Sequence, residues 1–242
     1  MPGLLGDEPI LADFRRAFGS ALRFEVMEPP ELGTPGAVLR SMHETGRWVA
    51  QHIAKRQPDG PVILGGYSFG AAVAYEAAAA LLSAGRTIGQ IVILDAPLTE
   101  FGPTVLPDHV HWYKRLLLTW GRSDLRRRIL LAMLTQAGPL TMSRVRRPLL
   151  GSFRIEAILA WRPATLPVPG LVVLSRDAGV AVRTRWTQLV PLATLIELPA
   201  THRALFSSES MAILRQAIFQ AVQPRLGYHP QALADELDRQ EA

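Results

Sequence analysis

The chain has 242 residues, 48% hydrophobic and 19% charged, which is enough for one α/β or barrel domain and too apolar for a disordered protein. It has no cysteine, which excludes disulfides, thiolate metal sites and a cysteine nucleophile. Its 26 basic and 21 acidic residues give a net charge of +5, which alone does not select a partner. The sequence shows neither a membrane span nor a signal-peptide pattern, so we expect a cytoplasmic protein.

Short β-branched apolar runs alternate along the chain with longer helical stretches, a pattern typical of an α/β fold with a mostly parallel sheet and flanking helices. The predicted strands, in chain order, are 23–27, 62–65, 90–94, 171–175 and 194–198. The predicted helices are 35–56, 69–84 and 208–222. We therefore expect one domain over residues 1–223, followed by a polar C-terminal tail over residues 224–242.

A long, mainly helical segment, residues 98–166, separates two of the predicted strands. It is longer than a crossover needs to be, so we expect a helical lid insertion. His109 and His111 lie within it without a third ligand nearby, so no metal site is expected. The segment also contains a group of arginines: Arg122, Arg126, Arg127, Arg128, Arg144, Arg146 and Arg147. They alternate with Leu and Ile at helical spacing, which argues against nucleic-acid binding and is compatible with a solvated helix face or a partner surface.

Residues 66–70, Gly-Tyr-Ser-Phe-Gly, stand between a predicted strand and a predicted helix, as a G-x-S-x-G nucleophile elbow requires. A turn this tight needs small residues, which Gly66 and Gly70 supply, with Tyr67 completing the elbow. The turn exposes the Ser68 hydroxyl beyond the sheet. The helix N-terminus then directs N–H groups, including that of Phe69, toward a developing oxyanion. The alternative is that Ser68 only caps the helix.

A nucleophilic serine needs a histidine base and an acid, which follow it in the order Ser, Asp or Glu, His in this type of fold. His202 fits best, because it lies between the last predicted strand and the last predicted helix. Two acids compete for the third role. Asp95 ends the strand 90–94, and Asp177 follows the strand 171–175. Either could orient the imidazole, and the residues alone leave both open.

These motifs resemble those of the thioesterase domains that end non-ribosomal peptide and polyketide synthases, which have the α/β-hydrolase fold. The resemblance covers most of the chain and rests on residues 66–70, on 91–95 (Ile-Val-Ile-Leu-Asp) and on 201–206 (Thr-His-Arg-Ala-Leu-Phe). In chain-terminating members the acid follows the strand after the nucleophile helix, which implies Asp95. In the separate editing enzymes it follows the next strand, which implies Asp177. The Leu-Asp ending favours Asp95.

The resemblance also implies a second oxyanion donor near the N-terminus. Residues 2–6, Pro-Gly-Leu-Leu-Gly, are similar to the loop that supplies this donor in the family, which implies the N–H of Leu4, with Leu5 as the fallback. Family members have a core strand directly before this loop, whereas only Met1 precedes it here. Either the start of the chain is misassigned, or N-terminal strands of the fold are missing, which would leave a sheet edge open.

The resemblance implies a serine thioesterase that takes an acyl or peptidyl chain from the phosphopantetheine thioester of a carrier protein. An acyl-Ser68 intermediate would be resolved by hydrolysis or cyclisation. The arginines of the lid segment would then face an acidic acyl or peptidyl carrier protein. We expect no resident cofactor, because phosphopantetheine arrives on the substrate. The alternatives are an editing thioesterase that uses Asp177, and a catalytically inactive, truncated module that only binds carriers.

Overall fold

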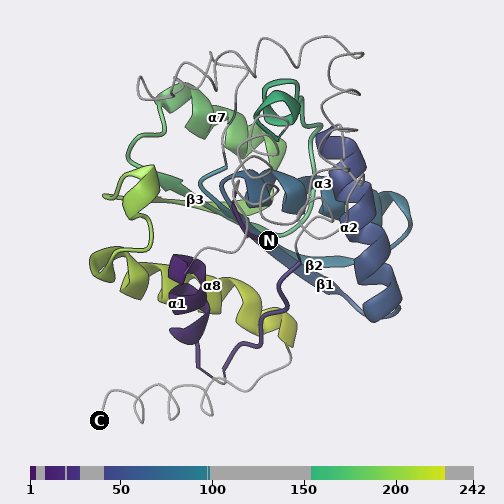
Figure 1. The fold of residues 1–242 in the computed structure, drawn as a ribbon, viewed down its shortest axis with the longest axis horizontal. Helices are drawn as coiled ribbons and strands as arrows, with labels where there is room; N and C mark the ends of the chain where they lie inside the picture. The colour runs from purple at the N-terminus through teal and green to yellow at the C-terminus, as the bar shows by residue number, and fades with distance from the viewer. Residues whose placement is uncertain (4–8, 20, 28–40, 97, 99–153, 227–242) are drawn as a thin grey trace, which may run out of the picture.

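The computed structural model describes residues 1–3, 9–19, 21–27, 41–96, 98 and 154–226, and places a parallel sheet between helices on both of its faces (Figure 1). The strands of this described part follow one another in the order β1-β2-β3-β4. They are β1 (Val62–Tyr67), β2 (Ile88–Leu94), β3 (Gly170–Ser175) and β4 (Ala193–Leu198). The labelled helices are α1 (Pro9–Arg16), α2 (Met42–Arg56), α3 (Phe69–Ser83), α7 (Val180–Leu189), the 3-10 helix η3 (His202–Ala204) and α8 (Ser208–Leu226), and residues 154–159 are also helical.

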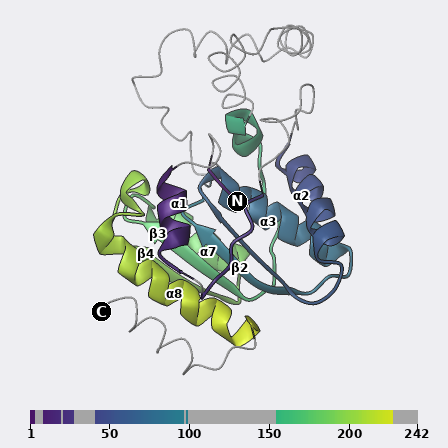
Figure 2. The ribbon, with the colours of Figure 1, turned by 60° about the horizontal axis from the view of Figure 1, so that its bottom comes forward.

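The two faces of the sheet are covered by different helices, as Figure 2 shows. On one face, side chains such as Leu64 and Ile93 pack with residues of α2, α3 and α7. On the other face, Val92 and Leu171 pack with residues of α1 and α8. The middle strands β2 and β3 are buried along their whole length, as expected for parallel strands covered on both sides.

The predicted strands at 62–65, 90–94, 171–175 and 194–198 correspond to β1 to β4, with small differences at the ends. The predicted strand at 23–27 is wrong, because the structure assigns no strand there. Its alternating sequence is strand-like, yet a strand also needs a neighbour for its backbone N–H and C=O groups. These residues instead run beside a cavity of about 390 Å³ that they line together with β1. Glu25 forms an ion pair with Arg56 at the end of α2.

The outer edge of β1 contacts the first residues of the chain. The Met1 amino group donates to the carbonyl oxygen of Gly65 at 2.6 Å, and the Tyr67 N–H donates to the carbonyl oxygen of Met1 at 3.3 Å. Residues 1–3 therefore lie along the carboxyl end of β1. The cavity lies along the same strand, lined by residues such as Val62 and Leu64.

Helix α2 begins after an N-cap serine and packs closely on α3. The Ser41 hydroxyl accepts a hydrogen bond from the N–H of Glu44 at 3.1 Å, which satisfies one free donor of the first turn. A Cβ atom on Gly46 would overlap the side chain of Glu76, so glycine allows the two helices to approach at this point.

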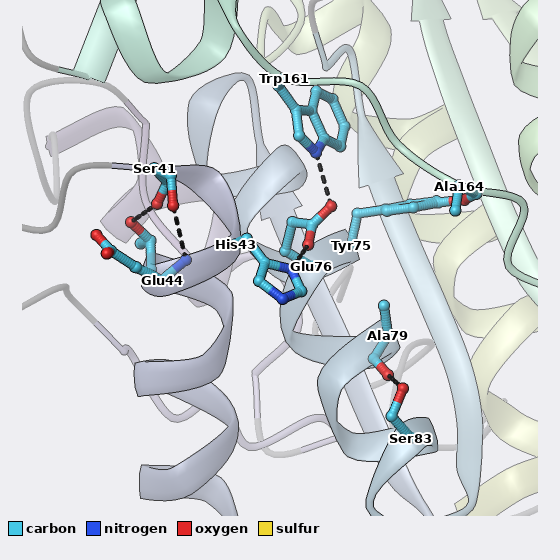
Figure 3. A network of polar contacts seen from close by, with 10 residues as sticks. Ser41, His43, Glu44, Tyr75, Glu76, Ala79, Ser83, Trp161 and Ala164 are labelled. Atoms are coloured by element: carbon cyan, nitrogen blue, oxygen red, sulfur yellow. Dashed lines mark hydrogen bonds and ion pairs between the residues drawn. The ribbon is translucent and has the colours of Figure 1, made fainter.

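A buried polar network joins α3 to the segment that enters β3 (Figure 3). The Glu76 carboxylate accepts a hydrogen bond from the indole N–H of Trp161 at 2.8 Å and lies 3.1 Å from the His43 Nδ1. The Tyr75 hydroxyl lies 2.6 Å from the carbonyl oxygen of Ala164 and 3.0 Å from that of Leu189. Burial, and secondly the Glu76 charge, raises the pKa of Tyr75 well above its ordinary value, so the hydroxyl keeps its proton and remains a donor.

We expect Trp161→Phe to lower the free energy of unfolding by about 1–3 kcal/mol, because a buried carboxylate oxygen loses its donor. His43→Ala is the matched control. It removes a contact of the same carboxylate made by a ring that is 68% exposed, where such pairs contribute about 0–1 kcal/mol. Urea unfolding followed by circular dichroism measures both variants. If both variants lost the same free energy of unfolding, the buried hydrogen bond from Trp161 to Glu76 would not be the more important contact.

The other predicted helices agree with the structure where it describes them. The helix predicted at 69–84 corresponds to α3, and residues 41–56 of the helix predicted at 35–56 hold the cap and body of α2. Helix α8 continues past residue 223, where we placed the domain boundary, to Leu226. Residues 99–153 of the predicted lid and 227–242 of the predicted tail lie outside the described residues. No helix in the described ranges combines the length and apolar composition that crossing a membrane requires.

Candidate active site

The sheet topology brings the ends of three strands to one edge. Ser68 directly follows β1, Asp95 directly follows β2, and His202 lies in η3 after β4. Because the strands are parallel, their carboxyl ends share an edge, where ligands of open α/β sheets usually bind. Residues far apart in the sequence can therefore meet here.

The backbone at Ser68 has the strained conformation of a nucleophile elbow. Its φ is 54° and its ψ is −122°, a region that costs a non-glycine residue about 1–3 kcal/mol. The Ser68 N–H donates to the carbonyl oxygen of Leu94 at 2.8 Å, which attaches the turn to β2. The side chain makes no capping hydrogen bond to α3, so the alternative that Ser68 only caps this helix does not describe its hydroxyl.

The glycines on both sides of Ser68 are required by close backbone contacts. A Cβ atom on Gly66 would overlap the carbonyl group of Gly70 in the first turn of α3. A Cβ atom on Gly70 would overlap the carbonyl oxygen of Pro2. The N-terminal residues therefore pack directly against the elbow at Gly70. A side chain at Gly70 would force them away, and one at Gly66 would force β1 away from the first turn of α3.

A continuous line of hydrogen bonds joins Ser68, His202 and Asp95. The Nε2 atom of His202 lies 3.1 Å from the Ser68 Oγ, and its Nδ1 atom lies 2.6 Å from the Asp95 Oδ2. A carboxylate only accepts, so Nδ1 carries the proton of this contact. In the neutral ring Nε2 then holds the lone pair, and it accepts from the Ser68 hydroxyl. This arrangement can take the proton of Ser68 as its oxygen attacks an electrophile.

Asp95 is held rigidly at the end of β2. It has a φ of 50°, and its N–H donates to the carbonyl oxygen of Val173 at 2.8 Å. Its Oδ1 accepts from the N–H of Ser175 at 2.8 Å, which leaves Oδ2 for the histidine. The Asp95 side chain is 8% exposed and that of His202 is 41% exposed. The acid is therefore buried behind the imidazole, while the ring reaches solvent.

The second candidate acid, Asp177, makes a different contact. Its Oδ2 accepts from the backbone N–H of His202 at 2.9 Å, and the residue is exposed. The structure thus distinguishes the two candidate acids, between which the residues alone could not decide. Asp95 contacts the ring of His202, and Asp177 contacts its backbone.

The described residues place one of the expected oxyanion donors. Phe69 is the first residue of α3, where helical N–H groups have no acceptor within the helix. Leu4 and Leu5 lie outside the described residues, although Gly3 before them lies against the Tyr67 ring. The buried Arg154 lies over the Phe69 ring, with its Cζ atom 5.3 Å from the ring centroid. A positive charge thus lies beside the residue that follows Ser68.

Sequence reasoning assigned Tyr67 only to the elbow and did not identify Ser175 or Arg154. The Tyr67 hydroxyl donates to the carbonyl oxygen of His202 at 2.9 Å, a contact between residues 135 positions apart. No spacing in the sequence indicates such a pair. Among the described residues, no group of three or more His, Cys, Asp or Glu side chains could hold a metal ion, and His109 and His111 lie outside them.

Comparison with known proteins relates part of the chain to thioesterase domains. Residues 6–104 match the family model described as Thioesterase domain. The non-reducing polyketide synthase PKS1 of Zymoseptoria tritici is 49% identical over 109 residues, which cover 45% of this chain and 5% of the synthase. The N-(5-amino-5-carboxypentanoyl)-L-cysteinyl-D-valine synthase of Amycolatopsis lactamdurans is 34% identical over 94 residues, 39% of this chain and 2% of that protein. The chain thus spans a small part of these relatives' length.

Solved structures show the same fold. Holo-AB3403, a four-domain nonribosomal peptide synthetase, superposes with a TM-score of 0.66 and 23% identity over 91% of this chain and 19% of that one. The NocB thioesterase domain in covalent complex with a fluorophosphonate nocardicin G analog superposes with a TM-score of 0.63 and 20% identity. The match covers 91% of both chains. YbtT, a type II thioesterase, superposes with a TM-score of 0.53 and 19% identity. The match covers 91% of this chain and 90% of that one. These structures confirm the α/β-hydrolase fold predicted from the sequence.

Proposed function

We propose that the chain is a serine thioesterase that releases an acyl or peptidyl chain from the phosphopantetheine thioester of a carrier protein through an acyl-Ser68 intermediate. The observation that carries this proposal is the line from the Ser68 Oγ through both ring nitrogens of His202 to the buried Asp95. The match to the Thioesterase domain family supports the reaction class. The synthases among the relatives support a carrier-bound substrate.

In the proposed first half-reaction, the His202 Nε2 takes the proton of Ser68 as the Oγ attacks the thioester carbonyl carbon. Two N–H groups hold the oxyanion of the tetrahedral intermediate: that of Phe69, and that of Leu4 or, as the fallback, of Leu5. When the intermediate collapses, the carbon–sulfur bond breaks and the protonated His202 gives its proton to the leaving thiolate. The products are the acyl-Ser68 ester and the free thiol of the carrier.

In the second half-reaction, water, or a hydroxyl or amine of the acyl chain itself, attacks the ester carbonyl carbon while His202 removes the proton of this nucleophile. When the second tetrahedral intermediate collapses, the bond between the carbonyl carbon and the Ser68 Oγ breaks, and His202 returns the proton to the Oγ. Water gives the free acid, and an internal nucleophile gives a cyclic product. Asp95 stays ionised throughout and stabilises the imidazolium that forms in both halves. Phosphopantetheine enters and leaves on the carrier, so the proposed reaction needs no resident cofactor.

The geometry favours this role over the alternatives. The editing hypothesis depends on Asp177 as the acid, yet the Asp177 carboxylate lies at the backbone of His202 and not at its ring. A module that only binds carriers does not require a strained serine aligned with a histidine and a buried acid. Such strain persists where the surrounding structure enforces it, and it is concentrated at functional sites.

The first test is time-resolved intact mass spectrometry of the protein mixed with a short acyl N-acetylcysteamine thioester. We expect a covalent adduct of the acyl mass that appears and then decays as thiol is released. Ser68→Ala is the matched control, because it removes one oxygen atom and should leave the fold unchanged. A cooperatively folded wild-type protein that forms no adduct and releases no thiol would contradict the proposal.

A further inference from the structure

The backbone of His202 is held from both sides by groups that take no part in the hydrogen-bonded line. Its N–H donates to the Asp177 Oδ2 at 2.9 Å, and its carbonyl oxygen accepts from the Tyr67 hydroxyl at 2.9 Å. His202 lies in η3, a helix of three residues, which provides little support of its own. The Asp95 contact orients the ring, but it does not fix the distance between the His202 backbone and the turn that holds Ser68.

Tyr67 is well placed to set this distance, because it is the last residue of β1 and directly precedes Ser68. Its ring stacks on the His202 ring, with centroids 5.0 Å apart and planes 20° apart. Phe206 also packs edge-on against the Tyr67 ring, with centroids 4.9 Å apart. The tyrosine therefore connects the strand that carries the nucleophile to the backbone that carries the base.

Asp177 attaches the same backbone to the end of β3. The neighbouring Arg176 N–H donates to the carbonyl oxygen of Ala200 at 3.0 Å, so two consecutive residues of this loop bind the segment that leads to His202. The Asp177 contact is exposed to solvent, where such interactions add little to global stability. Its effect is therefore expected on the position of His202 and not on the stability of the fold.

We propose that Tyr67 and Asp177 are positioning residues that clamp the His202 backbone from opposite sides and so fix the distance between Nε2 and the Ser68 Oγ. The inference rests on the proposed function of this site. A shift of about 1 Å between reacting groups can lower a rate by about 100-fold, so two hydrogen bonds that prevent such a shift affect the rate strongly.

The test uses variants that remove one hydrogen-bonding group each. Tyr67→Phe keeps the stacked ring and removes the hydroxyl, Asp177→Ala removes the acceptor, and Asp177→Asn retains an acceptor oxygen. Asp59→Ala is the control for a lost carboxylate, because Asp59 is exposed before β1, at the end of the strand away from Ser68. Each protein is measured for labelling of Ser68 by a fluorophosphonate probe, for kcat and KM with the N-acetylcysteamine thioester, and for Tm.

We expect Tyr67→Phe and Asp177→Ala to lower the labelling rate and kcat by about 10- to 100-fold, with KM and Tm nearly unchanged. Asp177→Asn should recover most of the loss, and Asp59→Ala should behave as wild type. Because both groups hold one backbone unit, the loss in the double variant should differ from the sum of the single losses on a free-energy scale. Wild-type rates in both single variants, with Ser68 of the wild type labelled normally, would overturn the clamp and leave the proposed function intact.

A wild-type protein that neither reacts with the probe nor turns over thioester would contradict the proposed function instead. The clamp is then judged by the low-field proton NMR resonance of the Nδ1–H between His202 and Asp95, which needs no activity. Its loss in Tyr67→Phe and Asp177→Ala, with retention in wild type and Asp177→Asn, supports the clamp. Equal spectra in all four proteins, whether the resonance is present or absent, overturn it.

Discussion

Asp95→Asn is expected to lower kcat for thioester hydrolysis by about 10⁴-fold, whereas Asp177→Asn should lower it by less than about 10-fold. The reason lies in the contacts of the Asp95 side chain. Its Oδ1 accepts from the Ser175 N–H, so in the variant the amide oxygen keeps this bond and the amide NH₂ faces the His202 Nδ1. The ring must then accept at Nδ1 and carry its proton on Nε2, where it cannot take the proton of Ser68.

The comparison is measured by steady-state kinetics with an acyl N-acetylcysteamine thioester, with Ser68→Ala defining the uncatalysed background. Asp177→Asn controls for the loss of one negative charge close to His202, because it also removes a carboxylate bonded to this residue. Equal and small losses in both variants would contradict Asp95 as the orienting acid. A large loss in Asp177→Asn alone would assign that role to Asp177, as in the editing hypothesis.

The parts of the fold that depend on local sequence were predictable. The parallel strands appear as β-branched apolar runs bounded by Gly, Pro or Asp, and β1 to β4 lie where those runs lie. The elbow was predictable for the same reason, because its strand, its two glycines and its helix are contiguous. The position of Ser68 beyond the sheet follows from this local order alone.

The parts that depend on distant neighbours were not predictable. Residues 23–27 have a strand-like alternation, but pairing is a property of two segments, and in the described part of the chain no strand pairs with them. The choice between Asp95 and Asp177 could not be made from spacing, since both follow strands whose carboxyl ends reach the same edge. The contact of Tyr67 with the His202 backbone joins residues 135 positions apart and has no signature in either segment.

Gly66→Ala is expected to lower the free energy of unfolding by about 1–3 kcal/mol and the labelling of Ser68 by about 100-fold. Gly65→Ala should leave the labelling of Ser68 unchanged and should not lower the free energy of unfolding. The two glycines are adjacent in β1 but meet different surroundings. A Cβ atom on Gly65 would lie 3.4 Å from the Val92 Cβ, an ordinary contact, whereas one on Gly66 would overlap the Gly70 carbonyl group.

The added methyl group is the same in both variants, so their difference isolates the contact between β1 and the first turn of α3. Only backbone movement can relieve the Gly66 overlap, and that movement would shift Ser68 away from the His202 Nε2, now 3.1 Å from its Oγ. At Gly65, alanine reduces the entropy of the unfolded chain and can add about 0.5–1 kcal/mol of stability. Urea unfolding and fluorophosphonate labelling measure the two effects. Equal behaviour of the variants would show that the close approach of Gly66 to Gly70 does not hold Ser68 in place.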